Sequence, residues 1–150
     1  MAFWRIYYHL VWATKERLPL ITPDVEQGLY NYIVGKADAL ECITNAIGGM
    51  EDHLHLLVSI PPKLSVAEFV QHIKGSSSHH LNHNALPTRP AFGWQRGYGV
   101  FSLGGKQLDD AIAYVVNQKT HHRQATVIAA LERCDEEEDG VQRSSSAASE

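Results

Sequence analysis

The sequence predicts a single α+β domain, built on an antiparallel sheet that carries two helices on one face. Three observations predict it: strand-like and helix-like segments alternate along the chain, one segment has the period-two pattern of a half-buried strand, and a short glycine-containing connection precedes that segment as in a hairpin. A chain of 150 residues supports one compact core, and a second domain is not expected.

The first half of the chain contains three predicted strands and one helix. Aromatic and β-branched residues crowd positions 4–14, which is typical of a strand. Thr22 as an N-cap and Pro23 at the first helical position open an amphipathic helix. Residues 41–50 and 51–60 then form two strands that we expect to pair as an antiparallel hairpin.

The second half completes the order β-α-β-β-α-β-α. Ser65 and Glu68 have the spacing of a capping box and open the second helix. Residues 84–97 are loop-like, 98–103 form a short last strand, and a third helix is expected from 106 to about 122. The first six elements are the split βαβ of ferredoxin-like and RRM-like folds, so the third helix is the element left to cover the open sheet face.

Charge is unevenly distributed along the chain. Residues 134–150 hold six of the 17 acids and one of the 13 bases, so the first 133 residues are near neutral and contain all nine histidines. We therefore expect a folded catalytic domain over 1–133 and an acidic, disordered tail over 134–150. The net charge of −4 does not exclude a nucleic-acid partner for the domain.

Cysteine usage and hydropathy indicate the compartment. Cys42 and Cys134 lie far apart without a C-x-x-C pair, as in a reduced cytoplasmic protein. No apolar run approaches the ~18 residues of a membrane span, and the N-terminus lacks a cleavage site, so no membrane partner or targeting segment is expected.

The predicted third strand carries a candidate metal site. Alternation places His53 and His55 on one face and Leu54, Leu56 and Val58 on the other. Two imidazoles at adjacent positions of one face can share a divalent metal ion. A solvated histidine pair is the alternative, since H-x-H is a short pattern.

The third helix carries a candidate nucleophile. Tyr114 and Gln118 are four residues apart and share a helix face. A tyrosine hydroxyl can attack a phosphodiester, and a metal held by two histidines and the Gln118 carboxamide oxygen would polarise the phosphate. Taken singly, Tyr114 would be a packing residue and Gln118 a surface amide.

Two motifs resemble those of a known superfamily. D-H-L-H-L-L at 52–57 is similar to the histidine-hydrophobic-histidine core of HUH endonucleases, and A-Y-V-V-N-Q at 113–118 resembles a motif of their small single-tyrosine transposases, a group that includes a REP-associated branch. Further blocks resemble that family in the same order, at 9–19, 48–57, 73–78 and 94–102.

The resemblance implies a transposase that cuts and rejoins single-stranded DNA at insertion-sequence ends, with Tyr114 as the nucleophile that forms a 5′-phosphotyrosine. It implies His53, His55 and Gln118 as ligands for Mg²⁺ or Mn²⁺. It also implies a homodimer that recognises DNA hairpins, in which the tyrosine helix can complete the partner's site. Past His122 the sequence departs from the family pattern, which leaves open how this helix is anchored.

Further contacts are expected from residue chemistry. Six residues could contact DNA through cations, hydroxyls or an aromatic ring: Lys74, Ser76, Ser77, Trp94, Arg96 and Lys119. Three polar residues are expected beside the metal ligands rather than on the metal: Asn117, His121 and His122. Either histidine could assist proton transfer from the phenol.

Three rival functions remain open at this point. A domesticated nuclease would process chromosomal palindromic repeats without mobilising its own gene. A catalytically silent nucleic-acid-binding module predicts that Tyr114→Phe changes nothing. A zinc hydrolase using His53, His55 and a further histidine predicts tight Zn²⁺ retention and no protein–DNA adduct.

Overall fold

The computed structural model describes residues 3–84, 91–124, 127–128 and 131–134. Its helices and strands follow the predicted order, with two short 3₁₀ turns added: β1 (Tyr7–Ala13), η1 (Lys15–Arg17), α1 (Pro23–Ala39), β2 (Ile43–Met50), β3 (His53–Ser59), α2 (Val66–Asn84), β4 (Gly99–Leu103), η2 (Gly105–Gln107), α3 (Leu108–Val116) and α4 (Gln118–Gln124). The predicted loop over 84–97 lies partly outside the described residues. No helix in the described ranges is both long and apolar enough to cross a bilayer.

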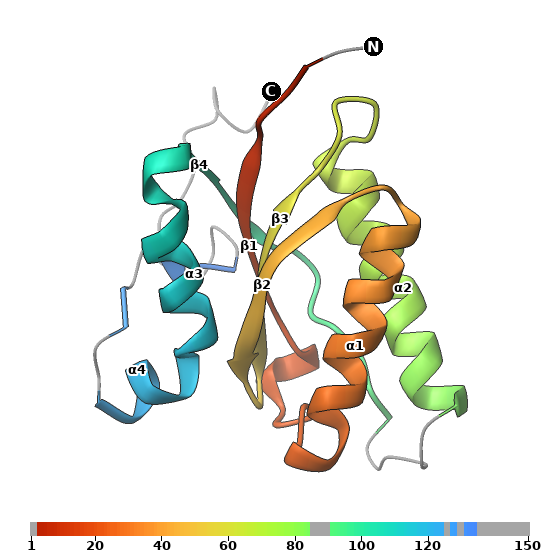
Figure 1. Cartoon of the computed structure of the whole chain (residues 1–150). Helices are drawn as coiled ribbons and strands as arrows, with labels where there is room; N and C mark the ends of the chain where they lie inside the picture. Colours follow the sequence, from red (N-terminus) through yellow and green to blue (C-terminus); the bar gives the residue numbers. More distant parts are fainter. Residues whose placement is uncertain (1–2, 85–90, 125–126, 129–130, 135–150) are drawn as a thin grey trace, which may run out of the picture.

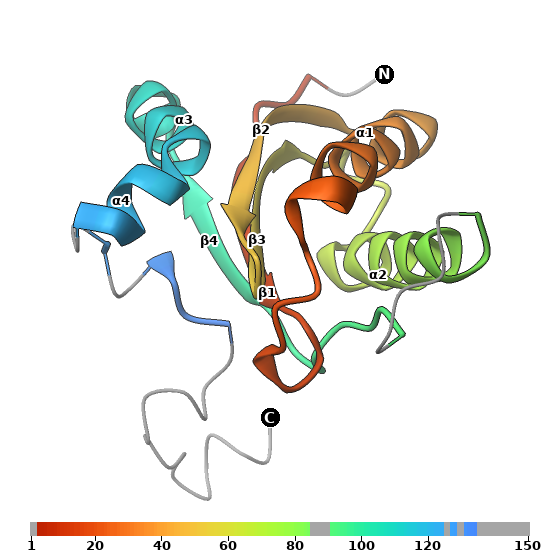
Figure 2. The same cartoon turned by 90° about the horizontal axis from the view of Figure 1, so that it is seen from below.

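The sheet has the strand order β2-β3-β1-β4, and every pair in it is antiparallel. Helices α1 and α2 cover one face, whereas α3 and α4 cover the other (Figure 1). Figure 2, seen from below, shows the sheet between these two helical layers. The predicted ferredoxin-like arrangement and the β2–β3 hairpin are therefore confirmed.

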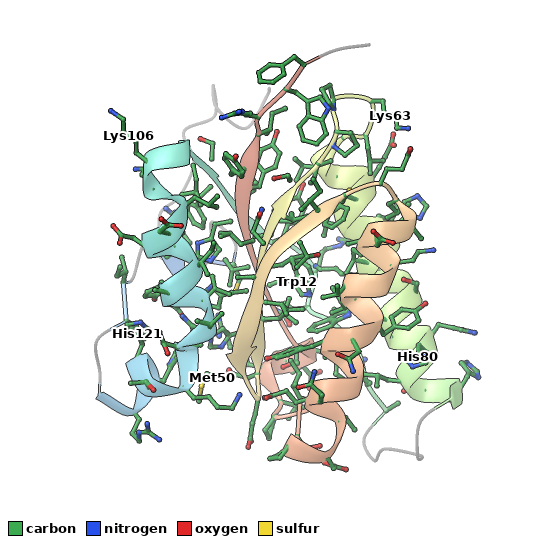
Figure 3. The ribbon with its side chains drawn as sticks, in the orientation of Figure 1. Trp12, Met50, Lys63, His80, Lys106 and His121 are labelled. Carbon is green, nitrogen blue, oxygen red and sulfur yellow. The ribbon has the colours of Figure 1, made fainter. Side chains whose placement is uncertain are left out.

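The larger core lies between the sheet and the α1–α2 layer. Trp12 of β1 is fully buried there, near the centre of the molecule (Figure 3). Leu54 and Leu56 of β3 enter the same core, as the alternation predicted. The Ser65 hydroxyl accepts a hydrogen bond from the Glu68 backbone N–H at 3.1 Å, which satisfies a free donor in the first turn of α2.

A smaller core holds α3 against the sheet. Leu57 of β3 packs there with Ala111 and Val115 of α3. The backbone of β2 approaches α3 so closely that a Cβ on Gly48 would lie 2.1 Å from the Val115 carbonyl oxygen. Glycine at this position is therefore what lets the tyrosine-bearing helix lie directly on the strand.

The prediction of one continuous helix over 106–122 is wrong. The segment opens with η2, and the chain then leaves helical geometry at Asn117, where φ is −102° and ψ is 23°, so that α3 and α4 are separate. The Asn117 side-chain amide donates to the Ala113 carbonyl at 2.8 Å. Asparagine competes with helical backbone bonding in this way, which accounts for the break at this residue.

Candidate active site

Strand β3 presents its two histidines to the face covered by α3. His53 is 3% exposed and His55 is fully buried, and their ring centroids lie 5.2 Å apart. The predicted placement on one face is confirmed, and the alternative of a solvated pair is wrong. Buried imidazoles need partners for their ring nitrogens, so their surroundings define the site.

Each of these imidazoles is held through Nδ1. His53 Nδ1 lies 2.7 Å from Asp52 Oδ1, and His55 Nδ1 lies 2.7 Å from Nε2 of His9, a buried residue of β1. Both histidines therefore direct Nε2 toward the same space below α3. A partner on one ring nitrogen fixes ring orientation and leaves the other nitrogen available to bind a metal.

The two histidines differ in their electrostatics. Burial opposes the charged form of His53, but its hydrogen bonds to Asp52 and Glu132 outweigh burial and raise its pKa to about 9. Burial lowers the pKa of His55, although the Glu132 carboxylate acts in the opposite direction. Burial and the neighbouring His55 lower the pKa of His9 to about 4, so this ring is neutral at pH 7.

The carboxylate of Glu132 lies at the centre of the site. Its Oε1 is 3.1 Å from His53 Nε2 and 3.0 Å from His122 Nε2. Its Oε2 is 3.1 Å from His55 Nε2 and accepts a hydrogen bond from the Tyr114 hydroxyl at 2.5 Å. Burial favours the protonated acid, but the adjacent imidazoles of His53 and His55 hold the pKa of Glu132 far below its ordinary value.

The segment that carries Glu132 is anchored to the sheet. Cys134 is 2% exposed and packs with Val11 and Ala13 of β1. Its neighbour Arg133 lies so close to β4 that a Cβ on Gly99 would be 2.0 Å from the Arg133 carbonyl oxygen. Cys134, the first residue of the predicted acidic tail, therefore packs on the sheet, and the rest of that tail, 135–150, lies outside the described residues.

Tyr114 projects from α3 toward the histidines of the sheet. It is 6% exposed, its ring lies edge-on to that of His55 with centroids 6.0 Å apart, and it stacks on His121 at 4.7 Å. The hydroxyl also accepts a hydrogen bond from the Ile128 backbone N–H at 2.9 Å. Burial and the bond to Glu132 raise the Tyr114 pKa to about 12, so the phenol is protonated in this arrangement.

Gln118 reaches the same point from the start of α4 and is 1% exposed. Its Oε1 lies 3.3 Å from His53 Nε2 and 3.1 Å from His122 Nε2, while its Nε2 donates to Glu132 Oε2 at 3.3 Å. The structure therefore brings Tyr114, Gln118 and both β3 histidines together despite the helix break. His122 joins them directly, whereas Asn117 is exposed and its side chain donates to the Ala113 carbonyl of α3.

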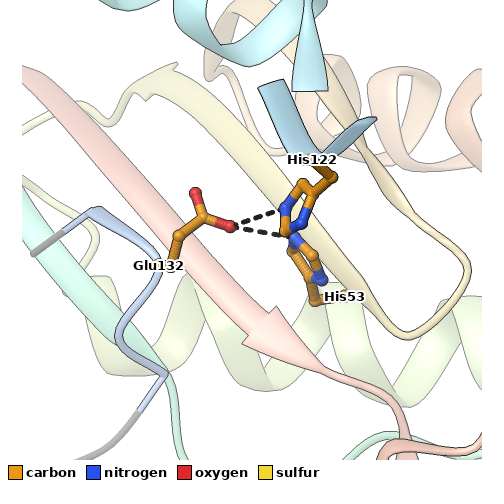
Figure 4. Close-up of side chains that lie close together, drawn as sticks. All are labelled: His53, His122 and Glu132. Atoms are coloured by element: carbon orange, nitrogen blue, oxygen red, sulfur yellow. Dashed lines mark hydrogen bonds and ion pairs between the residues drawn. The ribbon is translucent and has the colours of Figure 1, made fainter. Parts of the chain in front are cut away.

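These side chains fit a divalent metal ion. One nitrogen each from His53 and His122 and one oxygen of Glu132 lie within 4.8 Å of one another (Figure 4). His55 Nε2 is buried and, although 3.1 Å from Glu132, has no well-directed hydrogen bond. A mixed set of imidazole nitrogen, carboxylate oxygen and amide oxygen suits Mg²⁺, Mn²⁺ or Zn²⁺.

The two serines expected to bind DNA donate hydrogen bonds to carbonyls of their own helix. Ser76 donates to the His72 carbonyl at 2.6 Å. Ser77 is fully buried, donates to the Ile73 carbonyl at 2.6 Å and accepts from the Trp94 indole N–H at 2.9 Å. Ser77 therefore fixes Trp94 against α2, and its hydroxyl is not presented to solvent.

A groove of about 460 Å³ lies between α2 and residues 94–98. It is lined by three other residues that were expected to contact DNA: Lys74, Trp94 and Arg96. The Lys74 ammonium group already makes two hydrogen bonds within the protein, since its Nζ donates to the carbonyls of Gln95 at 2.9 Å and Gly97 at 2.5 Å. Arg96 is exposed. Lys119 lies elsewhere, on α4, and pairs with Glu26 at 2.6 Å.

Sequence reasoning missed Glu132 and His9. Glu132 follows a stretch without helical or strand periodicity, so no local pattern indicated that it returns to the site. His9 could have been found, because strand alternation from Val11 and Ala13 places it on the sheet face opposite Leu10 and Trp12. Which strand lies beside β3, however, is a property of the sheet order.

Comparison with known proteins identifies the family. The model of the IS200-like transposases matches residues 2–118. The chain is 32% identical over 80 residues to the ISDra2 transposase TnpA of Deinococcus radiodurans, a match that covers 52% of this chain and 56%, about half, of that relative. It is 31% identical over 110 residues to the transposase of insertion sequence IS200 of Salmonella typhimurium, covering 67% of this chain and 69% of that one.

Solved structures agree with this assignment. A crystal structure of a Deinococcus radiodurans protein described as a transposase superposes with a TM-score of 0.61 at 26% identity, covering 79% of this chain and 95% of that one. A REP-associated tyrosine transposase bound to a REP hairpin shares the fold, with a TM-score of 0.60 at 14% identity over 85% of this chain and 76% of that one. The family model spans well over half of the sequence, and the chain therefore belongs to the IS200-like transposases.

Proposed function

We propose that the protein cuts and rejoins single-stranded DNA at the ends of a mobile element, with Tyr114 as the nucleophile. One observation supports this most directly: the Tyr114 hydroxyl, both β3 imidazoles and the Gln118 carboxamide all lie within 3.3 Å of one carboxylate, that of Glu132. A nucleophile, a proton acceptor and metal-binding nitrogens therefore surround one point, as metal-assisted attack on a phosphodiester requires.

The metal in this proposal is Mg²⁺ or Mn²⁺, held by His53, His55 and Gln118, with Glu132 and His122 as further donors. Bound there, it would polarise the scissile phosphate and stabilise its developing charge. Asp52 and His9 keep the two β3 imidazoles turned toward the ion through their Nδ1 contacts.

The chemical step is a transesterification. The Tyr114 oxygen forms a bond to phosphorus, the bond from phosphorus to the 3′ oxygen breaks, and the strand is left as a 5′-phosphotyrosine and a free 3′-OH. Glu132 Oε2, 2.5 Å from the Tyr114 hydroxyl, would accept the phenol proton, and the leaving 3′ oxygen would take up a proton from water. Attack by a 3′-OH on the phosphotyrosine reverses the step and rejoins DNA without ATP.

Hairpin recognition and dimerisation belong to the same proposal. The groove with Lys74, Trp94 and Arg96 offers cations and an aromatic ring to a DNA backbone and its bases. The REP-associated relative is bound to a REP hairpin, which supports a hairpin substrate. The homodimer remains part of the proposal, although one chain alone already brings Tyr114 beside His55.

The test is adduct formation. The protein is incubated with Mn²⁺ or Mg²⁺ and labelled single-stranded hairpins, taken from the flanks of its gene and from repeated palindromes. We expect a slower band on a denaturing gel that disappears with Tyr114→Phe and with chelator, and persists with Tyr32→Phe, a matched change on α1. Absence of the band from folded, metal-loaded protein on every hairpin would favour a silent binding module.

A further inference from the structure

A second cavity adjoins the active site on the β2 side. It has a volume of about 280 Å³ and lies between the start of α1, the end of β2 and the α3–α4 junction. Its polar walls include Gln118, whose carboxamide also contacts the central Glu132. The cavity and the candidate active site therefore share Gln118.

Tyr30 gives the cavity an unexplained polar group. The side chain is 9% exposed, and its hydroxyl is buried with no hydrogen-bond partner in the described part of the chain. Buried hydroxyls in folded proteins are nearly always hydrogen-bonded, and an unpaired one requires an explanation. Because Tyr30 lines the cavity, a bound group can supply the missing acceptor.

The charges in the cavity favour a neutral ligand. Lys119 Nζ lies 2.6 Å from Glu26 Oε2 and donates to the Gly49 carbonyl at 3.4 Å, so the cation is balanced by an anion within the same walls. A phosphate here would face the Glu26 carboxylate. A nucleobase, by contrast, is neutral and carries both donors and acceptors on its edges.

The size of the cavity is also consistent with a single base. Pockets for drug-sized ligands begin at roughly 300 Å³, and this one lies at that lower limit. We propose that it binds one unpaired nucleobase adjacent to the scissile phosphate, with the Tyr30 hydroxyl and Lys119 donating to the base and Glu26 accepting from it. The inference depends on the proposed function, since it places the base on the strand that Tyr114 cleaves.

The experiment measures binding without chemistry. Labelled decamers of deoxyadenosine, deoxycytidine or thymidine, and an abasic decamer with the same phosphates, are titrated with the full chain in EDTA and followed by fluorescence anisotropy. Loss of one neutral hydrogen bond corresponds to about two- to tenfold in affinity. We expect Tyr30→Phe to weaken the best-bound base decamer by that factor and to leave the abasic decamer unchanged.

Two controls make the result specific. Tyr32→Phe, on the same helix but stacked on His80, should bind all four decamers as the wild type does. Tyr30→Phe should unfold at the wild-type temperature or above it, because the deleted hydroxyl has no partner in the described structure. The proposal is overturned if Tyr30→Phe leaves every affinity unchanged, if it weakens the abasic decamer equally, or if bases add nothing to wild-type binding.

The adduct assay separates this inference from the proposed function. Base-dependent binding that requires Tyr30, in a protein that forms no Tyr114 adduct, would overturn the cleavage function and retain the base pocket. If the adduct forms normally but Tyr30→Phe leaves decamer binding unchanged, the cleavage function is retained and the base pocket is overturned.

Discussion

At the scale of single residues, the site depends on which ring nitrogen each β3 histidine presents. Asp52 holds His53 through Nδ1, and losing such a partner typically costs 10- to 100-fold in metal affinity. We therefore expect Asp52→Asn to weaken Mn²⁺ binding by about tenfold, measured by electron paramagnetic resonance. Asp38→Asn, an exposed change on α1, is the control, and equal Mn²⁺ affinity in both variants would contradict the assigned role of Asp52.

The lowered pKa of His9 predicts that the stability of the fold depends on pH. Its pKa is about 4 in the folded protein and 6.5 when unfolded, so the unfolded chain binds more protons between these values. The contribution of His9 to stability is complete above pH 6.5 and is lost as pH falls toward 4. This loss amounts to about 3 kcal/mol.

The measurement is urea unfolding in EDTA at pH 7 and pH 4. The wild type should lose more free energy of unfolding over this interval than His9→Gln does, because glutamine does not titrate. Equal losses in the two proteins would show that His9 is not buried in its neutral form.

At the scale of elements, the contact between β2 and α3 positions Tyr114, the proposed nucleophile. Gly48→Ala would put a methyl group 2.1 Å from the Val115 carbonyl, which neither backbone can easily avoid. We expect a loss of about 1–3 kcal/mol in the free energy of unfolding, typical of overpacking. Displacement of α3 from the histidines should also reduce adduct formation at temperatures where the variant is folded.

A second glycine variant provides the control for this prediction. Gly35 lies within α1, and a Cβ there would meet nothing within 4 Å. Gly35→Ala should therefore stabilise the helix by roughly 0.5–1 kcal/mol and leave adduct formation unchanged. If both alanine variants behave alike in thermal unfolding, close approach at Gly48 is not what holds α3.

At the scale of the whole molecule, residues that follow α4 complete the candidate site. A chain ending at residue 130 lacks both Glu132 and the buried Cys134, so three imidazoles lose their carboxylate partner. Its melting temperature should fall by on the order of 5 °C or more. A chain ending at Cys134 should melt as the full chain does, because residues 135–150 hold few apolar side chains.

Local patterns were sufficient for most of the fold and for half of the site. Period-two alternation placed His53 and His55 opposite Leu54 and Leu56, because a strand has only two faces. The i, i+4 spacing of Tyr114 and Gln118 predicted that they share one side of a helix. They do meet in the structure, although the helix breaks between them at Asn117. The break at Asn117 escaped prediction, since asparagine is tolerated in many helices.

The sequence by itself determined the order of the strands and main helices, the two faces of β3 and the expectation that the helix carrying Tyr114 lies at the site. These features follow from periodicity, capping and turn residues within a few positions of one another. Only the tertiary structure decided that Glu132 occupies the centre, that His9 supports His55 and that Tyr30 faces a second cavity. The contact between His9 and His55 joins residues 46 positions apart, and that between His55 and Glu132 joins residues 77 positions apart. Such contacts depend on strand order and close packing, which no local pattern encodes.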